Sequence, residues 1–243
     1  MAERVLPIAL VGAMHEEIAA LRPCLEDLRT EHRAGREFHL GRLEGHDVVL
    51  VRCGIGKVAA ATTTAVLLDA YDARALLFTG VAGGLGDGVR VGDIVVATTL
   101  LQHDMNAEPL FPRWEVPLTG RARFDADAQW TARLVQACRA LAATDAHSDG
   151  AAIHDGLVVS GDRFVATQAE SDQLRALLPD ALAVEMEGAA VAQVCHDFGR
   201  PFGVVRTISD RADDAAHGDF QRFVCSVAAP YSRDIVRAVL KLA

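Results

Sequence analysis

Short apolar segments alternate with helical patterns along almost the whole chain, and this alternation is the feature that most constrains its fold. The segments expected to form strands are 7–13, 38–43, 47–53, 75–79, 93–97, 156–160, 182–186 and 202–208. The helical patterns cover about 15–28, 56–71, 126–143, 168–177 and 187–198. Strands that are apolar throughout are typical of a largely parallel sheet with helices on both faces. The alternation therefore predicts an α/β fold.

The sheet is expected to be mixed, because one pair of strands reads as a hairpin. The stretch GRLEGHDV turns at Glu44 and Gly45, between two apolar runs. The last part of the chain, from about 217 to 242, has a helical pattern that Pro230 interrupts. Because proline lacks the backbone donor that a helix interior needs, we expect a kink or two consecutive helices there.

One long segment, 105–123, fits neither the strand period nor the helix period. Its sequence, MNAEPLFPRWEVPLTGRAR, contains three prolines and two aromatic residues. Long ordered loops in compact domains are often lids or interface arms. Leu110, Phe111 and Trp114 should not lie free in water. We therefore expect this segment to cover a pocket or to contact a partner.

Composition limits the domain count and the location of the protein. The chain has 243 residues, of which 51% are hydrophobic, which suits one domain over 1–243 with a sizeable core. No apolar stretch reaches the roughly 18–20 residues that a membrane span needs. The opening MAERVLPIALVGAMHEE lacks the pattern of a signal peptide, so a cytoplasmic location is expected.

Charge and cysteine content limit the partners. The net charge of −9 argues against a nucleic-acid partner, because phosphate backbones require a basic face. The five cysteines are scattered and never form a CxxC pair, which predicts neither a disulfide framework nor a zinc site. A small molecule is the expected partner.

Acidic residues follow several of the expected strands at their carboxyl ends, where open α/β sheets bind ligands. The segments that follow these strands are Met14–Glu17, the glycine-rich 80–88, GDRFV at 161–165, Glu187, and Asp210. Taken alone, each acid has a structural explanation, as a favourable charge at a helix start or as a cap or turn residue. Several acids at one edge repel each other unless they hold a polar ligand, and neighbours perturb each other's pKa. Their convergence therefore predicts a site.

Paired carboxylates suit the cleavage of a glycosidic bond. One acid protonates the leaving group and one carboxylate activates water, across an oxocarbenium-like transition state. When the leaving group is a purine, an Asp beside the base can protonate a ring nitrogen. The chain has no GxSxG elbow, no HExxH pattern and no cysteine with an obvious basic partner, so acyl transfer and zinc chemistry lack support.

Six segments, in this order, resemble one enzyme family along nearly the whole chain. They are GAMHEE (12–17), CGIGKVAAA (53–61), FTGVAGGLGDGVRVGDIVV (78–96), SGDRFV (160–165), AVEMEGAAVAQVCHDFGRPFGVVRTISD (183–210) and HGDF (217–220). The family is that of the 5′-methylthioadenosine/S-adenosylhomocysteine nucleosidases, within the purine nucleoside phosphorylase/uridine phosphorylase superfamily. The resemblance implies a three-layer α/β/α sandwich around a mixed, barrel-like sheet, and a homodimer. It also implies hydrolysis of an adenosyl thioether without metal or organic cofactor.

The resemblance assigns catalytic roles to four residues. Asp210 matches the general acid that contacts purine N7 and N6, and Ser209 would orient its carboxylate. Glu17 matches the glutamate that activates the attacking water, and Arg206 matches an arginine near that water.

The resemblance also assigns the substrate pocket. Glu187 matches the residue that grips the ribose hydroxyls, Met186 packs against the sugar, and Glu185 also lines this region. Phe164 would stack on the adenine, whose edge the backbone of Val165 would read. The remaining substrate-binding positions are Met14, Ile55 and Phe220 at the 5′-alkylthio group, and Val81 and Gly83 in the glycine-rich segment. A loop from the partner subunit closes this pocket in the family, and 105–123 is the corresponding candidate.

Two departures from the family pattern bear on specificity. Val81 stands where serine is usual and removes a hydroxyl near the ribose or the water, and His15 replaces a more typical acidic residue. The segment 105–123 also differs from the usual form, which leaves the preferred 5′ group open.

Three alternative functions remain at this point. A phosphorylase would need a cation for phosphate, and only Arg90 and Arg206 are candidates near the site. A futalosine hydrolase would share the same edge chemistry. A non-enzymatic nucleoside-binding protein would not need Asp210 and Glu17, and both are present.

Overall fold

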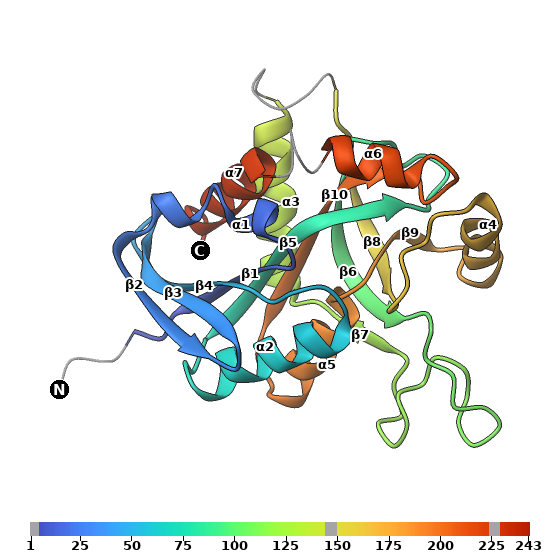
Figure 1. Cartoon of the computed structure of the whole chain (residues 1–243), viewed down its shortest axis with the longest axis horizontal. Coiled ribbons are helices and arrows are strands. Elements are labelled where there is room, and N and C mark those ends of the chain that lie inside the picture. The colour runs from blue at the N-terminus through green and yellow to red at the C-terminus, as the bar shows by residue number, and fades with distance from the viewer. Residues whose placement is uncertain (1–4, 144–149, 224–228) are drawn as a thin grey trace.

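The computed structural model describes residues 5–143, 150–223 and 229–243 and shows a strongly twisted sheet between two groups of helices (Figure 1). The strands are β1 (Ile8–Gly12), β2 (Glu26–Arg33), β3 (Arg36–Leu43), β4 (His46–Arg52), β5 (Ala75–Gly84), β6 (Ile94–Gln102), β7 (Arg123–Asp125), β8 (Ile153–Ser160), β9 (Ala181–Glu185) and β10 (Phe202–Asp210). The helices are α1 (His15–Ile18), α2 (Lys57–Asp69), α3 (Ala128–Ala142), α4 (Gln168–Leu177), α5 (Gly188–Asp197), α6 (Ala216–Phe223) and α7 (Ala229–Leu240), with a short 3-10 turn at Arg22–Cys24.

The described strands form one mixed sheet in the order β10-β6-β8-β9-β5-β1-β4-β3-β2, and β7 adds to β6. Because β10 also pairs with β5, the strands β5, β10, β6, β8 and β9 close into a five-stranded barrel. The strand pairs β1–β4, β1–β5, β5–β10, β6–β8 and β8–β9 are parallel, whereas β10–β6, β5–β9 and the β2-β3-β4 ladder are antiparallel. The expected mixed, barrel-like sheet is therefore confirmed.

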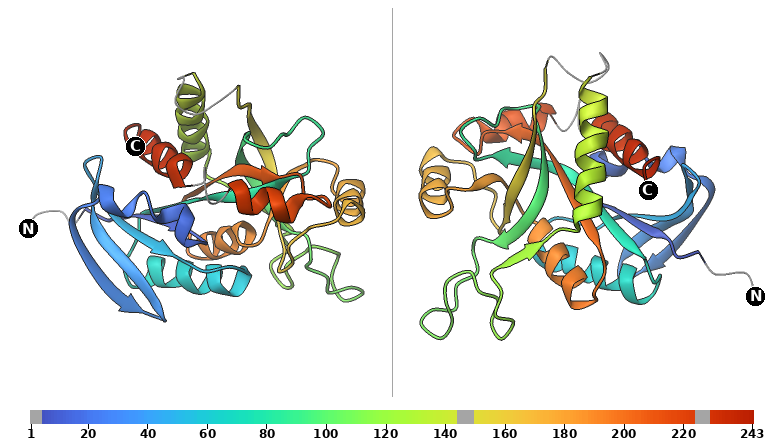
Figure 2. Two further views of the ribbon diagram at one scale, coloured as in Figure 1. Left: turned by 45° about the horizontal axis from the view of Figure 1, so that its top comes forward. Right: turned by 180° about the vertical axis from the view of Figure 1, so that it is seen from behind.

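Strand alternation divides the core between the two helical layers. Ala9 and Val11 of β1 pack into the cluster that α2 and α5 cover, whereas Ile8 and Leu10 pack into the cluster that α3 and α7 cover. Figure 2 shows these helix groups on opposite sides of the sheet. Burying one such aliphatic side chain contributes roughly 1.5–3 kcal/mol, so a strand that is apolar on both faces is stable only between two layers.

The N-terminal helix expected over 15–28 is wrong beyond its first turn. α1 ends at Ile18, Pro23 lies in the 3-10 turn, and β2 begins at Glu26. β2 was not predicted because its sequence, EDLRTEHR, has almost no buried side chain. The strand is recruited through its backbone pairing with β3, which leaves no apolar pattern in the sequence.

The strand expected over 75–79 is longer than predicted, since β5 continues into the glycine-rich segment 80–88 as far as Gly84. The expected hairpin is confirmed, since Leu43 pairs with His46 and both Glu44 and Gly45 have positive φ. The described part of the last helical pattern contains two helices, α6 and α7, and Pro230 lies in the first turn of α7. The segment expected to be a long loop runs from the end of β6 to β7, and we refer to residues 105–122 as the arm.

Two further observations concern the described residues. No helix among them is long and apolar enough to cross a membrane. Cys24, Cys53, Cys138 and Cys195 are free thiols, and Cys225 lies outside the described residues.

Candidate active site

A cavity of about 310 Å³ opens where the carboxyl ends of β1, β5, β8, β9 and β10 meet. All the site residues expected from the sequence line it, with the exception of Arg206, which is buried behind its wall. Five further residues that were not expected from the sequence also line the cavity: Ala13, Ala82, Arg163, Val184 and His217. His217 and Arg163 lie in HGDF and SGDRFV, so those motifs carried a signal for them.

Glu17 is held as a buried carboxylate by backbone donors. Its Oε2 accepts the N–H groups of Ala13 at 2.6 Å and Met14 at 2.9 Å, and its Oε1 accepts the N–H of Val81 at 3.1 Å. Burial raises the pKa of Glu17, although the charge of Arg206 and the three N–H groups act in the opposite direction. A carboxylate with a raised pKa and a fixed orientation can accept a proton from water. The contact from Val81 comes from its backbone and does not depend on its side chain.

Two glycines of β5 provide the space for the two carboxylates expected to act in catalysis. A Cβ at Gly80 would lie 2.6 Å from Glu17 Oε1 and 3.0 Å from Arg206 Nη1. A Cβ at Gly83 would lie 2.9 Å from Asp210 Oδ1. Any larger residue would displace these groups, so the glycine-rich sequence reflects close approach to β5 and not a loop.

Asp210 ends β10 next to a β-bulge. The register of β10 against β5 shifts between Ile208 and Asp210, which leaves Ser209 as the extra residue. Bulges redirect side chains at the ends of strands. Asp210 Oδ2 accepts the hydroxyl of Ser209 at 2.8 Å, and Oδ1 accepts the N–H of Ala212 at 2.8 Å. Burial raises the pKa of Asp210, and the negative charges of Asp213 and Asp219 add to this effect, whereas the Ala212 N–H and the Ser209 hydroxyl act in the opposite direction.

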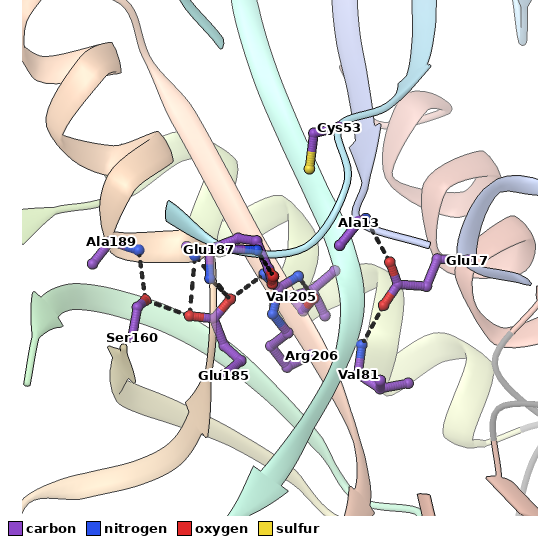
Figure 3. Close-up of polar contacts among 12 residues, drawn as sticks. Ala13, Glu17, Cys53, Val81, Ser160, Glu185, Glu187, Ala189, Val205 and Arg206 are labelled. Carbon is purple, nitrogen blue, oxygen red and sulfur yellow. Dashed lines mark hydrogen bonds and ion pairs between the residues drawn. The ribbon is translucent and has the colours of Figure 1, made fainter. Parts of the chain in front are cut away.

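Glu185 and Glu187 have different surroundings, although only Met186 separates them. Glu185 accepts the hydroxyl of Ser160, the backbone N–H groups that begin α5, and Arg206 Nη2 at 2.5 Å. Glu187 Oε1 accepts the N–H of Gly56 at 2.8 Å. Figure 3 shows Glu185 enclosed by these contacts. The Glu185 carboxylate is therefore engaged by the protein itself, which the sequence had left open.

Arg206 is the buried cation that accompanies these acids. It is 1% exposed, and its guanidinium carbon lies 4.0 Å from the centre of the Phe78 ring. Burial alone would lower the pKa of Arg206, but the charges of Glu185, Glu17 and Glu187 hold it above its usual value. Arg206 therefore stays charged and offsets part of the negative potential around the cavity.

Two aromatic residues form the apolar wall of the cavity. Phe164 follows β8, Phe220 lies on α6, and their rings meet edge to face with centres 5.5 Å apart. Phe164 is 39% exposed. Such a surface can stack against a flat aromatic ligand.

The raised pKa of Glu187 leads to a stability prediction. Burial, followed by the charge of Glu185, raises the pKa of Glu187 to about 8, whereas the unfolded side chain titrates near pH 4.5. Between these values the folded protein keeps a proton that the unfolded chain releases, so the free energy of unfolding falls as the pH rises. Glu187→Gln removes this penalty. We expect Tm to be about equal to the parent's near pH 5 and about 5 °C above it near pH 8.5, by scanning calorimetry.

The matched control is Glu16→Gln, which changes a carboxylate outside this cavity. It should shift Tm by the same small amount at both pH values. A Glu187→Gln difference that does not vary with pH would contradict the raised pKa.

Arg90, which the sequence offered as a possible phosphate ligand, does not reach the cavity. It is exposed on the turn between β5 and β6, where its backbone N–H donates to Asp93 Oδ2. His15 is exposed and lies outside the cavity, on a neighbouring groove. Of the two departures from the family pattern, only Val81 therefore borders the site.

Comparisons with known proteins agree with this geometry. The profile of the phosphorylase superfamily matches residues 7–241. The chain is 37% identical over 237 residues to a 5′-methylthioadenosine/S-adenosylhomocysteine nucleosidase of Tolumonas auensis, covering 97% of this chain and 99% of that protein.

Solved structures of related enzymes are also similar to this chain over nearly its whole length. The nucleosidase of the same name from Neisseria meningitidis, in complex with methylthio-immucillin-A, superposes with a TM-score of 0.90 at 36% identity, covering 98% of this chain and 99% of that one. The futalosine hydrolase of Helicobacter pylori superposes with a TM-score of 0.89 at 30% identity, covering 98% and 99%.

Proposed function

The chain belongs to the phosphorylase superfamily, and we propose that it hydrolyses the N-glycosidic bond of 5′-methylthioadenosine and S-adenosylhomocysteine, releasing adenine and the 5′-thioribose. Full-length relatives of this name support the activity, and a solved relative holds methylthio-immucillin-A. The observation that carries the proposal is the pair of buried acids, Glu17 and Asp210, which line one cavity close to Gly80 and Gly83 of β5.

Asp210 is proposed as the general acid. It passes its proton to N7 of the purine as the bond between C1′ and N9 breaks and the bonding electrons go to the base. The carboxylate that this leaves is stabilised by the Ser209 hydroxyl and the Ala212 N–H. The sugar develops oxocarbenium character at C1′, which nearby carboxylates stabilise.

Glu17 is proposed as the general base. It takes a proton from a water molecule whose oxygen forms the new bond to C1′. Its three backbone donors hold the carboxylate in place before the reaction, so little reorganisation is needed. Arg206 offsets the charge of Glu17 and Glu185 from behind the wall.

The remaining contacts are proposed to bind the substrate. Glu187, held by the Gly56 N–H, would accept the ribose hydroxyls, and Met186 would pack against the sugar. Phe164 and the Val165 backbone would bind adenine. Met14, Ile55 and Phe220 would surround the 5′ group, with Val81 and Gly83 at the inner wall.

A single assay separates hydrolysis from phosphorolysis. Methylthioadenosine is supplied with and without inorganic phosphate, and the sugar product is identified by mass spectrometry. We expect free methylthioribose at the same rate in both cases, because acids surround the reaction centre and Arg206 is already paired with Glu185. Strict dependence on phosphate, with a sugar 1-phosphate as product, would overturn the proposal.

Futalosine belongs in the same assay, because a futalosine hydrolase is among the structural neighbours. The ratio of kcat/KM for methylthioadenosine to kcat/KM for futalosine measures the preference of the 5′ pocket directly. We expect the ratio to exceed one, since Met14, Ile55 and Phe220 make that pocket apolar.

A homodimer is also proposed, with the arm of one subunit covering the pocket of the other. Leu110 and Leu118 on the arm are 83% and 90% exposed, and Ile55 and Val58 beside the pocket are 59% and 78% exposed. Exposed aliphatic residues at both places suit a contact between copies. Sedimentation velocity, which gives the mass in solution, tests the proposal.

A further inference from the structure

Two segments that build the pocket are bonded to one aspartate outside it. The ribose turn (residues 53–57) follows β4, carries Ile55 and Gly56, and ends at Lys57, the first residue of α2. The base segment (residues 161–165) follows β8 and carries Phe164. Asp104 lies between them, bonded to both, and directly precedes the arm in the sequence. The arm projects from the sheet after β6 (Figure 1). We propose that Asp104 is a positioning residue that holds the ribose turn and the base segment in the relative positions that substrate binding requires.

The Asp104 carboxylate contacts both segments at once. Its Oδ1 accepts Lys57 Nζ of the ribose turn at 2.6 Å, and its Oδ2 accepts the backbone N–H of Asp162 at 2.9 Å. The side chains of Lys57 and Asp104 are 16% and 33% exposed, so water competes only partly for these bonds. Each carboxylate oxygen therefore anchors a different wall of the pocket.

A third bond closes the link between the two segments. The carboxylate of Asp162 accepts the backbone N–H of Lys57 at 2.7 Å. The preceding residue, Gly56, has a φ of +96° and donates its N–H to Glu187. The hydrogen bond from the Lys57 N–H to Asp162 therefore fixes the peptide that follows Gly56, the residue whose own N–H orients Glu187. A shift of Asp104 would move both the donor to Glu187 and the backbone next to Phe164.

Lys57 is also tied to the helix that follows Glu187. Its ammonium donates to Gln102 Oε1 at 3.1 Å, and Gln102 Nε2 donates to Gln193 of α5 at 2.8 Å.

Burial alone would raise the pKa of Asp104, but the bond from Lys57 holds it below its usual range. The Asp104 carboxylate is therefore charged in the folded enzyme near neutral pH and can accept both hydrogen bonds. Lys57 Nζ and the Asp162 N–H both donate to Asp104. In Asp104→Asn the side-chain NH₂, itself a donor, would face one of these two groups, so one hydrogen bond would be lost.

The inference rests on the proposed function and is tested with the full-length enzyme. Asp104→Asn is compared with Asp180→Asn, which breaks an exposed bidentate pair with Arg123 away from the pocket. We expect Asp104→Asn to raise KM for methylthioadenosine about tenfold and to weaken adenine binding in calorimetry by a similar factor. Its kcat should change less than threefold. Asp180→Asn should leave all three quantities unchanged.

Two further variants separate positioning from general stability. Lys57→Met should raise KM as Asp104→Asn does, and the double variant should be no worse than the more affected single variant, because both act through one contact. Asp104→Glu, which keeps the acceptor, should recover part of the affinity. A merely structural role would lower Tm without moving KM.

The outcomes of the two proposals are distinguishable. If the proposed function is wrong, the parent enzyme itself releases no free methylthioribose. If only the role of Asp104 is wrong, the parent is active, and a folded Asp104→Asn keeps KM and adenine affinity within twofold of the parent. That second result would overturn the inference.

Discussion

Asp210→Asn is expected to lower kcat for methylthioadenosine by about 10³-fold and to preserve the fold. Asparagine has the same shape and can still accept the Ala212 N–H, but it has no proton to give to the purine. General acids contribute roughly 10²–10⁴-fold in rate. Steady-state kinetics measure the loss, and circular dichroism and Tm report the fold. Activity within tenfold of the parent would remove Asp210 as the acid.

A substrate with a different leaving group tests the chemical role directly. An aryl riboside that leaves as a stable nitrophenolate needs no protonation, so Asp210→Asn should slow its hydrolysis far less than that of methylthioadenosine. Ser209→Ala is the matched control, because it removes a partner of the carboxylate and leaves the acid in place. We expect this control to cost about tenfold.

Glu17→Gln is expected to lower kcat by a comparable factor, about 10²–10⁴-fold. Both oxygens of Glu17 accept backbone N–H groups, and a glutamine amide would direct its NH₂ at one of these donors. This substitution should therefore also lower Tm. Glu17→Ala with added sodium formate separates the two effects, because formate can replace the missing carboxylate. A variant that keeps parental turnover would contradict the proposed base.

Gly80→Ala tests the position of Glu17 without changing its chemistry. The new Cβ would lie 2.6 Å from Glu17 Oε1, so the carboxylate has to move. A displacement of about 1 Å can cost around 100-fold in rate, and we expect a loss of that size. Gly88→Ala is the control, since nothing lies within 4 Å of its Cβ and its φ is not positive.

Most of the fold could be predicted because its strands are buried on both faces. Such strands appear in the sequence as apolar runs, and α4 and the β3–β4 hairpin coincide with their predicted positions. β2 could not be predicted, since it is held by backbone pairing and exposes most of its side chains. The five-stranded closure was implied only by the family resemblance, because it depends on β10 pairing with β5, more than a hundred residues away.

The candidate site was predictable as a set of residues but not as a set of contacts. The parallel strands β1, β5 and β10 bring Glu17 and Asp210 to one edge of the sheet. β9, which leads to Glu187, runs antiparallel to β5, so the place of Glu187 at the same cavity does not follow from strand direction. Asp104 was missed because its contacts with Lys57 and Asp162 join three loops that are separated in the sequence. No local pattern marks such a residue.

By itself, the sequence determined the order of the buried strands and of the longer helices, but not β2 or β7, and it determined which acids line the pocket. Apolar periodicity is a local property, so it can be seen in the chain. Tertiary structure alone decided how the acids are used. In AVEME, Glu185 and Glu187 both line the cavity, yet Ser160, Arg206 and the start of α5 engage the Glu185 carboxylate, while Glu187 accepts the N–H of Gly56. The pKa and availability of a buried carboxylate depend on its neighbours in space, and only the folded chain brings those neighbours together.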